Sequence, residues 1–171
     1  YNRPWYKDLP KKLEKRTGKN FVAIDNKKDL NRDSLNSIKP KHIFFPHWSY
    51  LIPEEIYRKF NCVIFHMTDL PYGRGGSPLQ NLIVRGHRDT MISAIQCVKD
   101  FDAGPVYLKK PLSLDGSAKD IFTRASHIIE EMIVEILETN PQPVAQKGKV
   151  VNFTRRKPED GNLKNAESLD E

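Results

Sequence analysis

The sequence has very little cysteine. Cys62 and Cys97 are the only two among 171 residues, and each lies within an apolar run. Neither has a second Cys or a His at metal-ligand spacing, which argues against a disulfide framework and against a metal site. Both thiols are therefore expected to be small, buried, apolar groups.

Long apolar runs are missing as well. No segment approaches the ~18 residues that a membrane-spanning helix needs, and no signal-peptide pattern opens the chain. Hydrophobic residues make up 38% and charged residues 29% of the sequence, which is the balance of a globular protein rather than a disordered one. We expect a cytoplasmic domain with no membrane contact.

Complete phosphate-binding motifs are also absent. The sequence "GRGG" at residues 73–76 precedes a predicted helix, but it lacks the full G-x-G-x-x-G pattern and the Lys-Ser/Thr of a P-loop. A dinucleotide or nucleoside triphosphate site is weakly supported. A turn that lets a substrate approach is favoured, and this substrate loop consists of Arg74, Gly75, Gly76 and Ser77.

Acidic residues are fewer than basic ones, and the formal net charge is +6. Such an excess can indicate a polyanionic partner such as nucleic acid. The basic residues are interleaved with acids rather than with stacking aromatic side chains, so a solvated surface is favoured over a nucleic-acid interface.

Strand-like runs alternate with segments of helical spacing along the chain. The predicted strands are residues 20–25, 42–46, 62–66, 90–98 and 105–114. A long apolar stripe at helical spacing predicts a core helix over residues 117–140. This order predicts an α/β fold with a mainly parallel, Rossmann-like sheet and helices on both faces.

We expect one domain over residues 1–140, with its first strand missing, and a truncated C-terminal extension or linker over residues 141–171. In a parallel α/β fold the ligand cleft lies beyond the carboxyl ends of the strands. The loops at these ends are residues 46–53, 66–78 and 99–105, and they contain most of the polar and aromatic candidates for a site.

These loops resemble those in the catalytic domain of the folate-dependent formyltransferases, which include methionyl-tRNA, glycinamide ribonucleotide and nucleotide-sugar N-formyltransferases. The likeness covers about residues 20–140 and rests on "HMTDLPYGRGGSPLQ" (residues 66–80) and "KDFDAGP" (residues 99–105). In the family, a His before a Leu-Pro turn and an Arg-Gly element pairs with an Asp. Here these are His66 and Asp102, 36 residues apart.

The resemblance implies an enzyme that moves a formyl group from 10-formyltetrahydrofolate to a primary amine. Such a transfer passes through a tetrahedral intermediate with an oxyanion and a developing ammonium, so the site needs a hydrogen-bond donor and a proton acceptor. His66 is expected to manage the proton and to polarise the formyl oxygen. Asp102 is expected to orient His66 and to stabilise its charged form.

One position departs from the family pattern. Members commonly carry Asn two positions before the His, where it helps to hold the formyl oxygen, and this chain has Ile64 there. Thr68 and Asn81 are candidate substitutes, and Asp69 could bind the incoming amine. Thr68 and Asp69 could equally be turn residues that bond local backbone, and Asn81 could be an exposed helix residue.

The resemblance also implies where the folate binds. The implied cofactor contacts are Leu51, Ile52, Val98, Asp100 and Asp102. Trp48 and Tyr50 could wall the pocket and His47 could contact the substrate. Ordinary core closure, and a histidine satisfied by backbone groups, are the alternatives.

The tail Arg156-Lys157-Pro158-Glu159-Asp160 resembles a segment of the sugar-modifying branch. It favours a small-molecule acceptor, a nucleotide-linked amino sugar. The alternatives are a methionyl-tRNA formyltransferase-like enzyme, whose partner is tRNA, and a non-catalytic folate- or nucleic-acid-binding module on the same scaffold. A homodimer is compatible with each.

Overall fold

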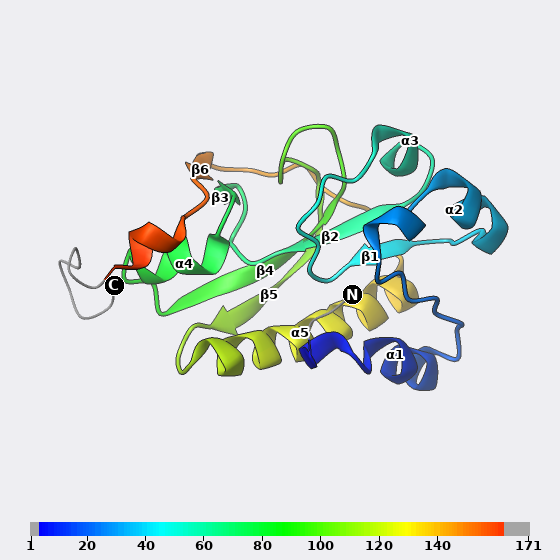
Figure 1. Ribbon diagram of the computed structural model, residues 1–171, viewed down its shortest axis with the longest axis horizontal. Coiled ribbons are helices and arrows are strands. Elements are labelled where there is room, and N and C mark those ends of the chain that lie inside the picture. Colours follow the sequence, from blue (N-terminus) through cyan, green and yellow to red (C-terminus); the bar gives the residue numbers. More distant parts are fainter. Residues whose placement is uncertain (1–3, 163–171) are drawn as a thin grey trace.

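The computed structural model describes residues 4–162, which form a four-stranded sheet with a two-stranded sheet beside it (Figure 1). The strands are β1 (Ile43–Phe45), β2 (Cys62–His66), β3 (Tyr72–Gly75), β4 (Asp89–Gln96), β5 (Val106–Ser113) and β6 (Val151–Phe153). The α-helices are α1 (Leu9–Thr17), α2 (Arg32–Ile38), α3 (Glu54–Tyr57), α4 (Pro78–Ile83) and α5 (Ala118–Thr139). Short 3-10 turns are η1 (Pro4–Tyr6), η2 (Lys27–Asp29) and η3 (Pro158–Gly161).

The four-stranded sheet has the order β1-β2-β4-β5 and is mixed. β1 runs parallel to β2, whereas β4 runs antiparallel to both β2 and β5. The α/β class is confirmed, but the expected parallel arrangement holds only for β1 and β2 within this sheet. β4 and β5 are joined by residues 97–105, and this connection is too short to contain the crossover helix that parallel neighbours need.

The strand predicted at residues 20–25 does not form. This segment connects α1 to η2 without regular pairing. Phe21 packs against one hydrophobic cluster and Ile24 against the other, while Val22 is 62% exposed. The apolar alternation therefore reflects burial on two sides of an irregular segment.

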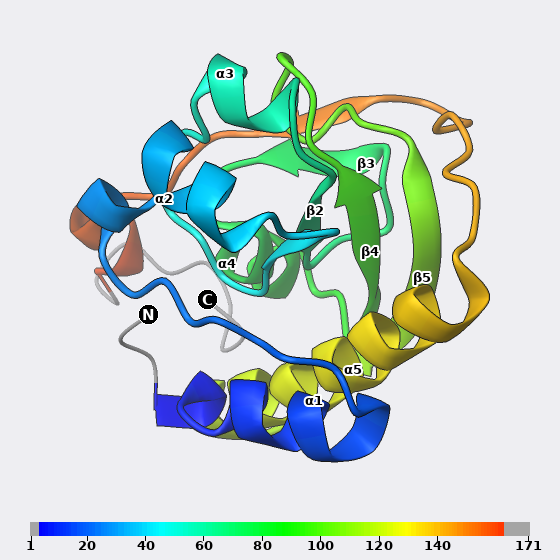
Figure 2. The same cartoon turned by 90° about the vertical axis from the view of Figure 1, so that its right-hand side faces the viewer.

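Helices cover both faces of the four-stranded sheet (Figures 1 and 2). α1 and α5 pack on one face, and α2 and α3 pack on the other. Along β2, Val63 and Phe65 join the cluster with α1 and α5, whereas Cys62 joins the cluster with α2 and α3. Successive side chains of a strand point to opposite faces of the sheet. A strand that is buried on both faces, such as β2, therefore needs a continuous run of apolar residues.

α5 carries the apolar stripe that the sequence predicted. Ile129, Met132 and Ile133 are fully buried beneath the sheet. The helix begins with a capping box in which Ser117 and Asp120 accept hydrogen bonds from each other's backbone N–H groups. It ends at Asn140, which has the left-handed conformation common after helices.

The chain after α5 returns along the molecule. Val144 exchanges backbone hydrogen bonds with Val106 at the start of β5, and β6 pairs with β3 in parallel. Phe153 in β6 is only 5% exposed. Figures 1 and 2 show this segment crossing the side of the molecule opposite α5, so residues beyond α5 complete the fold.

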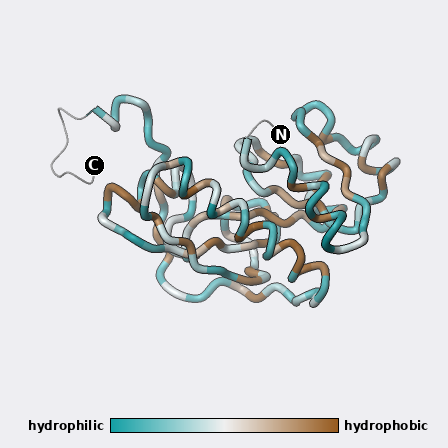
Figure 3. The backbone as a smooth tube through the Cα atoms, turned by 90° about the horizontal axis from the view of Figure 1, so that it is seen from below, coloured by the Kyte–Doolittle hydropathy of each residue, from teal (hydrophilic) through white to brown (hydrophobic). Residues whose placement is uncertain are grey.

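Hydrophobic residues concentrate in the interior of the described chain, and the turn that follows β6 is hydrophilic (Figure 3). Across residues 4–162, each helix is too short or too polar to cross a bilayer.

Candidate active site

A cleft of ≈ 1070 Å³ lies against β2 and β4. Ile64 and Ile95, which are neighbours across these two strands, line it. Its other walls come from the loop after β1, the turn into α4 and the loop after β4. The first of these follows β1 as expected, and the second follows β3, within the loop that the sequence placed after residues 62–66. The third leaves β4 at the opposite end of the sheet, because β4 is antiparallel, and it folds back toward His66.

His66 is the last residue of β2, and it is 7% exposed. Its Nε2 atom lies 2.8 Å from the carbonyl oxygen of Gly73. A carbonyl only accepts hydrogen bonds, so Nε2 carries the proton and donates it. In neutral His66 the lone pair therefore belongs to Nδ1, and this nitrogen faces Asp102.

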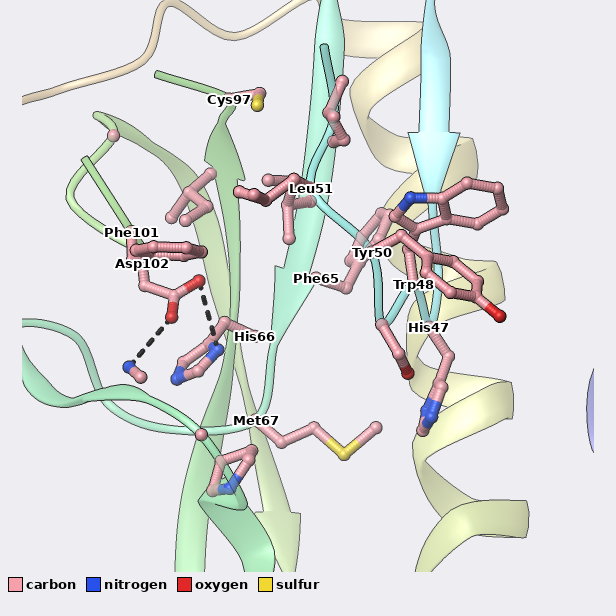
Figure 4. A pocket seen from close by; sticks show the side chains of 18 of the residues that line it. His47, Trp48, Tyr50, Leu51, Phe65, His66, Met67, Cys97, Phe101 and Asp102 are labelled. Carbon is pink, nitrogen blue, oxygen red and sulfur yellow. Dashed lines mark hydrogen bonds and ion pairs between the residues drawn. The ribbon is translucent and has the colours of Figure 1, made fainter. Parts of the chain in front are cut away.

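Asp102 approaches His66 from the loop after β4 (Figure 4). Its Oδ1 lies 3.5 Å from Nδ1 of His66, and its Oδ2 accepts a hydrogen bond of 2.9 Å from the backbone N–H of Gly75. The backbone φ of Asp102 is +50°, a left-handed conformation that Asp tolerates better than most residues. The carboxylate thus joins the end of β2 to the end of β3.

The spacing of the pair limits what it can do. At 3.5 Å the two atoms are beyond a typical N–H···O hydrogen bond, but close enough for a charged imidazolium to be stabilised by the carboxylate. The arrangement therefore suits a base at Nδ1 whose protonated form is held by Asp102.

Most of the predicted site residues surround this one cleft. Those that line it are Leu51, Ile52, His66, Gly75, Gly76, Ser77, Val98, Asp100 and Asp102. Trp48, Tyr50 and His47 line it as well. His47 stands edge-on to the ring of Phe122, and burial lowers its pKa, which keeps it neutral near pH 7.

Thr68, Asp69 and Asn81 do not line the cleft. Thr68 is fully buried, and its hydroxyl donates to the carbonyl of Gly73. Asp69 pairs with Lys109 on the surface.

Asn81 is buried in α4 rather than exposed. Its amide nitrogen lies 2.9–3.0 Å from three backbone carbonyls, those of Gly76, Ser77 and Thr154, and its oxygen accepts from Arg85. The structure therefore places none of the three suggested oxyanion or amine contacts at the cleft, because each polar group is engaged elsewhere.

Arg74 also lies outside the cleft lining, although its neighbours Gly75 and Gly76 are within it. Its guanidinium donates twice to the side-chain oxygen of Gln146. Gln146 was not a candidate from the sequence, since it lies in a Pro- and Gln-containing segment without periodicity or motif.

Arg155, Trp5 and Phe122 are among the cleft residues that the sequence did not predict. Arg155 follows β6, so only the β3 and β6 pairing brings it beside Gly76. Trp5 and Phe122 stack with their ring centroids 4.9 Å apart at the cleft edge. Phe122 belongs to the apolar stripe of α5, which had suggested core packing alone.

Cys97 lies on the cleft wall but is only 7% exposed. Burial raises its pKa to about 11. The thiol is therefore protonated near pH 7 and is a poor candidate nucleophile.

No protein-family model matches the chain. The solved structure of a methionyl-tRNA formyltransferase from Clostridium thermocellum is 47% identical, with a TM-score of 0.89 over 93% of this chain and 71% of that chain. The curated methionyl-tRNA formyltransferase of Ehrlichia ruminantium (strain Welgevonden) is 27% identical over 145 residues, covering 79% of this chain and 48% of that protein.

The formyltransferase PseJ from Anoxybacillus kamchatkensis shares the fold, with a TM-score of 0.67 at 14% identity over 90% of this chain and 82% of PseJ. The chain spans about half the length, or less, of the curated relatives it matches. The identity to the Clostridium protein extends over most of both chains. The chain belongs to the folate-dependent formyltransferase family.

Proposed function

We propose that this chain transfers a formyl group from 10-formyltetrahydrofolate to a primary amine. The observation that carries the proposal is the His66–Asp102 pair on the cleft wall. Gly73 holds Nε2 of His66, and Nδ1 faces the carboxylate of Asp102 at 3.5 Å. A histidine with one nitrogen fixed and the other beside a carboxylate is suited to accept a proton from an attacking amine.

Two exposed apolar side chains on the rim of the cleft support a folate site. Leu51 and Phe101 are 69% and 70% exposed, and both line the cleft from different loops. Large apolar side chains exposed together often mark a ligand site, and a flat pterin or aminobenzoyl ring would cover them. PseJ, which shares the fold, was solved in complex with tetrahydrofolate.

The bound donor supplies the formyl carbon that the acceptor amine attacks. His66 accepts at Nδ1 the proton that the amine nitrogen loses as the new C–N bond forms. Asp102, held by the N–H of Gly75, stabilises the resulting imidazolium. His66 then returns the proton to the folate nitrogen from which the formyl group departs, which balances the transfer.

The formyl oxygen needs a hydrogen-bond donor, and the side chain of Ile64 has none. Thr68 and Asn81 are bonded away from the cleft. In its charged form His66 has one N–H committed to Gly73, so Nδ1–H is the ring donor that remains for the oxygen.

Methionyl-tRNA is the acceptor that the comparisons favour. The curated relative from Ehrlichia and the Clostridium structure are both named methionyl-tRNA formyltransferases. This preference replaces the nucleotide-linked amino sugar that the tail at residues 156–160 suggested. The sugar acceptor is retained as a second candidate because Arg155, an exposed cation, lines the cleft, and because PseJ was solved with UDP-4,6-dideoxy-4-formamido-L-AltNAc.

The test is an assay of the purified protein with 10-formyltetrahydrofolate and either methionyl-tRNA or a UDP-linked amino sugar, with the formylated product detected by mass spectrometry. His66→Ala and Asp102→Asn should each lower kcat by about 10²- to 10⁴-fold, because proton transfer is lost. His127→Ala, an exposed position on α5, is the matched control.

Unchanged activity in either cleft variant would remove the assigned roles. Calorimetry with 5-formyltetrahydrofolate separates the donor site from the chemistry. Absence of folate binding to the folded protein would remove the proposal itself.

A further inference from the structure

We propose that Gln146 is a positioning residue for the Asp102 carboxylate. Its side-chain amide ties the loop after β4 to Arg74 in β3, and it thereby holds Asp102 opposite His66. The importance of this position for catalysis rests on the proposed function, whereas the positioning itself can be measured without any substrate.

All four hydrogen-bonding positions of the Gln146 amide are used. Nε2 donates to the carbonyl oxygens of Asp102 and Gly104, at 2.8 Å each. Oε1 accepts from Nε and Nη2 of Arg74, at 3.1 and 2.7 Å. Arg can only donate and a carbonyl can only accept, so the orientation of the amide is unambiguous.

Other contacts also constrain the loop that Gln146 holds, because Gly75 donates to the Asp102 carboxylate and the N–H of Ala103 donates to the carbonyl of Asp100. Asp100 and Phe101 are exposed, and Asp102 adopts a left-handed backbone conformation. A non-glycine residue in this region persists when surrounding contacts impose it. The hydrogen bonds from Gln146 lie on either side of Ala103 and constrain the turn that directs the Asp102 side chain toward His66.

Gln146 itself is held on both sides along the chain. Val144 is bonded to Val106 of β5, and β6, which follows, pairs with β3. The amide is therefore held between two strands, and it joins three segments that are distant in sequence. Arg74 does not line the cleft, so its contribution to the site passes through Gln146.

If Gln146 served only to pack the core, its replacement would have a different effect from the loss of a positioning residue. Loss of packing would lower the stability of the protein but leave the relation between Asp102 and His66 intact. Loss of positioning would change the environment of Nδ1 of His66, which is the ring atom that faces the carboxylate.

The experiment is a long-range ¹H–¹⁵N correlation spectrum of the histidine rings, recorded at one pH on the whole protein. The variants are Gln146→Leu, Asp102→Asn, the double variant, and Gln142→Leu as the control. Gln142 is exposed on the same segment and lies four residues away. Apart from Asp102, the charged residues that line the cleft are Glu54, Lys99, Asp100 and Arg155, and they are unchanged in all of these variants.

In Gln146→Leu, the Nδ1 resonance of His66 should move from its wild-type position toward its position in Asp102→Asn. The double variant should show no further movement, because the partner is already lost, and Gln142→Leu should match the wild type. With an active protein, kcat should also fall at least about tenfold while KM for the donor changes little, since misplaced catalytic groups slow the chemical step.

A wild-type Nδ1 resonance in a folded Gln146→Leu protein would overturn the proposal, as would additive shifts in the double variant. If the Leu variant does not fold, Gln146→Glu decides. It keeps acceptors for Arg74 but sets a carboxylate against two carbonyls, so it should shift Nδ1 of His66, and a wild-type spectrum would again overturn the proposal. Absence of formyl transfer in the wild type would count against the proposed function and leave these spectra interpretable.

Discussion

At the scale of single residues, the neighbours of each histidine decide its chemistry. His66 has a carbonyl at one ring nitrogen and a carboxylate facing the other. His47 also lines the cleft, but burial lowers its pKa. The pKa of His42 is lowered by burial and then by the charge of Lys41. These three histidines therefore differ in what they can do, and of the three His66 has the carboxylate that can stabilise a bound proton.

The two cysteines should be unreactive in the folded protein. Burial raises the pKa of Cys62 to about 12 and that of Cys97 to about 11. Only the thiolate reacts, so both thiols should react slowly with iodoacetamide at pH 8 and quickly in guanidinium. Mass spectrometry of the alkylated protein measures this. Rapid labelling of the native protein at either position would contradict it.

The same thiols should make stability depend on alkaline pH. Their folded-state pKa lies above the ordinary value of 9.0, so between about pH 9 and 11 the folded protein binds more protons than the unfolded chain. The free energy of unfolding should then fall as the pH rises through this window. Urea denaturation at pH 8 and pH 10 measures it, and the fall should be smaller in Cys62→Ala than in the wild type.

At the scale of elements, α5 supplies much of the core on one face of the sheet. Replacing Ile133, which is fully buried, with Ala should lower the free energy of unfolding by about 2–5 kcal/mol, because the lost side chain leaves a cavity. Chemical denaturation measures the change. Glu131→Ala, at an exposed position on the same helix, is the control and should lie within about 0.5 kcal/mol of the wild type.

The connection between β4 and β5 depends on Gly104. A Cβ atom there would overlap the backbone carbonyl oxygen of Gln96, so Gly104→Ala should displace the loop that carries Asp102. We expect a destabilisation of about 1–3 kcal/mol, together with weaker binding of 5-formyltetrahydrofolate by calorimetry. Gly161→Ala has open space at its Cβ and is the control. Wild-type folate affinity in Gly104→Ala would show that the loop tolerates the shift.

At the scale of the whole molecule, the segment after α5 belongs to the fold and to the site. It contributes Phe153 to the core, Gln146 to the Asp102 loop and Arg155 to the cleft. A chain that ended with α5 would lose all three.

Phe153→Ala tests this dependence. The ring packs against Tyr72 and lies beneath the guanidinium of Arg85, so its loss should cost about 3–5 kcal/mol and release β6 from β3. Hydrogen exchange should then increase at both strands. Val150→Ala, at a position that is 45% exposed, should change neither stability nor exchange appreciably.

Local sequence patterns were enough to predict several elements of this protein and its family. The apolar stripe of residues 117–140 predicted α5, because helical periodicity depends on residues within a few positions of each other. The run before His66 predicted β2 for the same reason. The order of the two loop motifs indicated the family and made His66 and Asp102 the candidate pair, since a motif can be recognised without knowledge of the fold.

Features that depend on contacts between segments remote in sequence were decided only by the tertiary structure. The direction of β4 depends on its pairing with β2, and residues 20–25 form no strand although their apolar alternation is strand-like. Thr68 and Asn81 are unsuited to the cleft because carbonyl groups brought to them by the fold occupy their donors. Gln146 had no local signal at all. Its role arises only where β3, the loop after β4 and the chain beyond α5 come together, and hydrogen bonds across such distances are set by packing rather than by sequence neighbours.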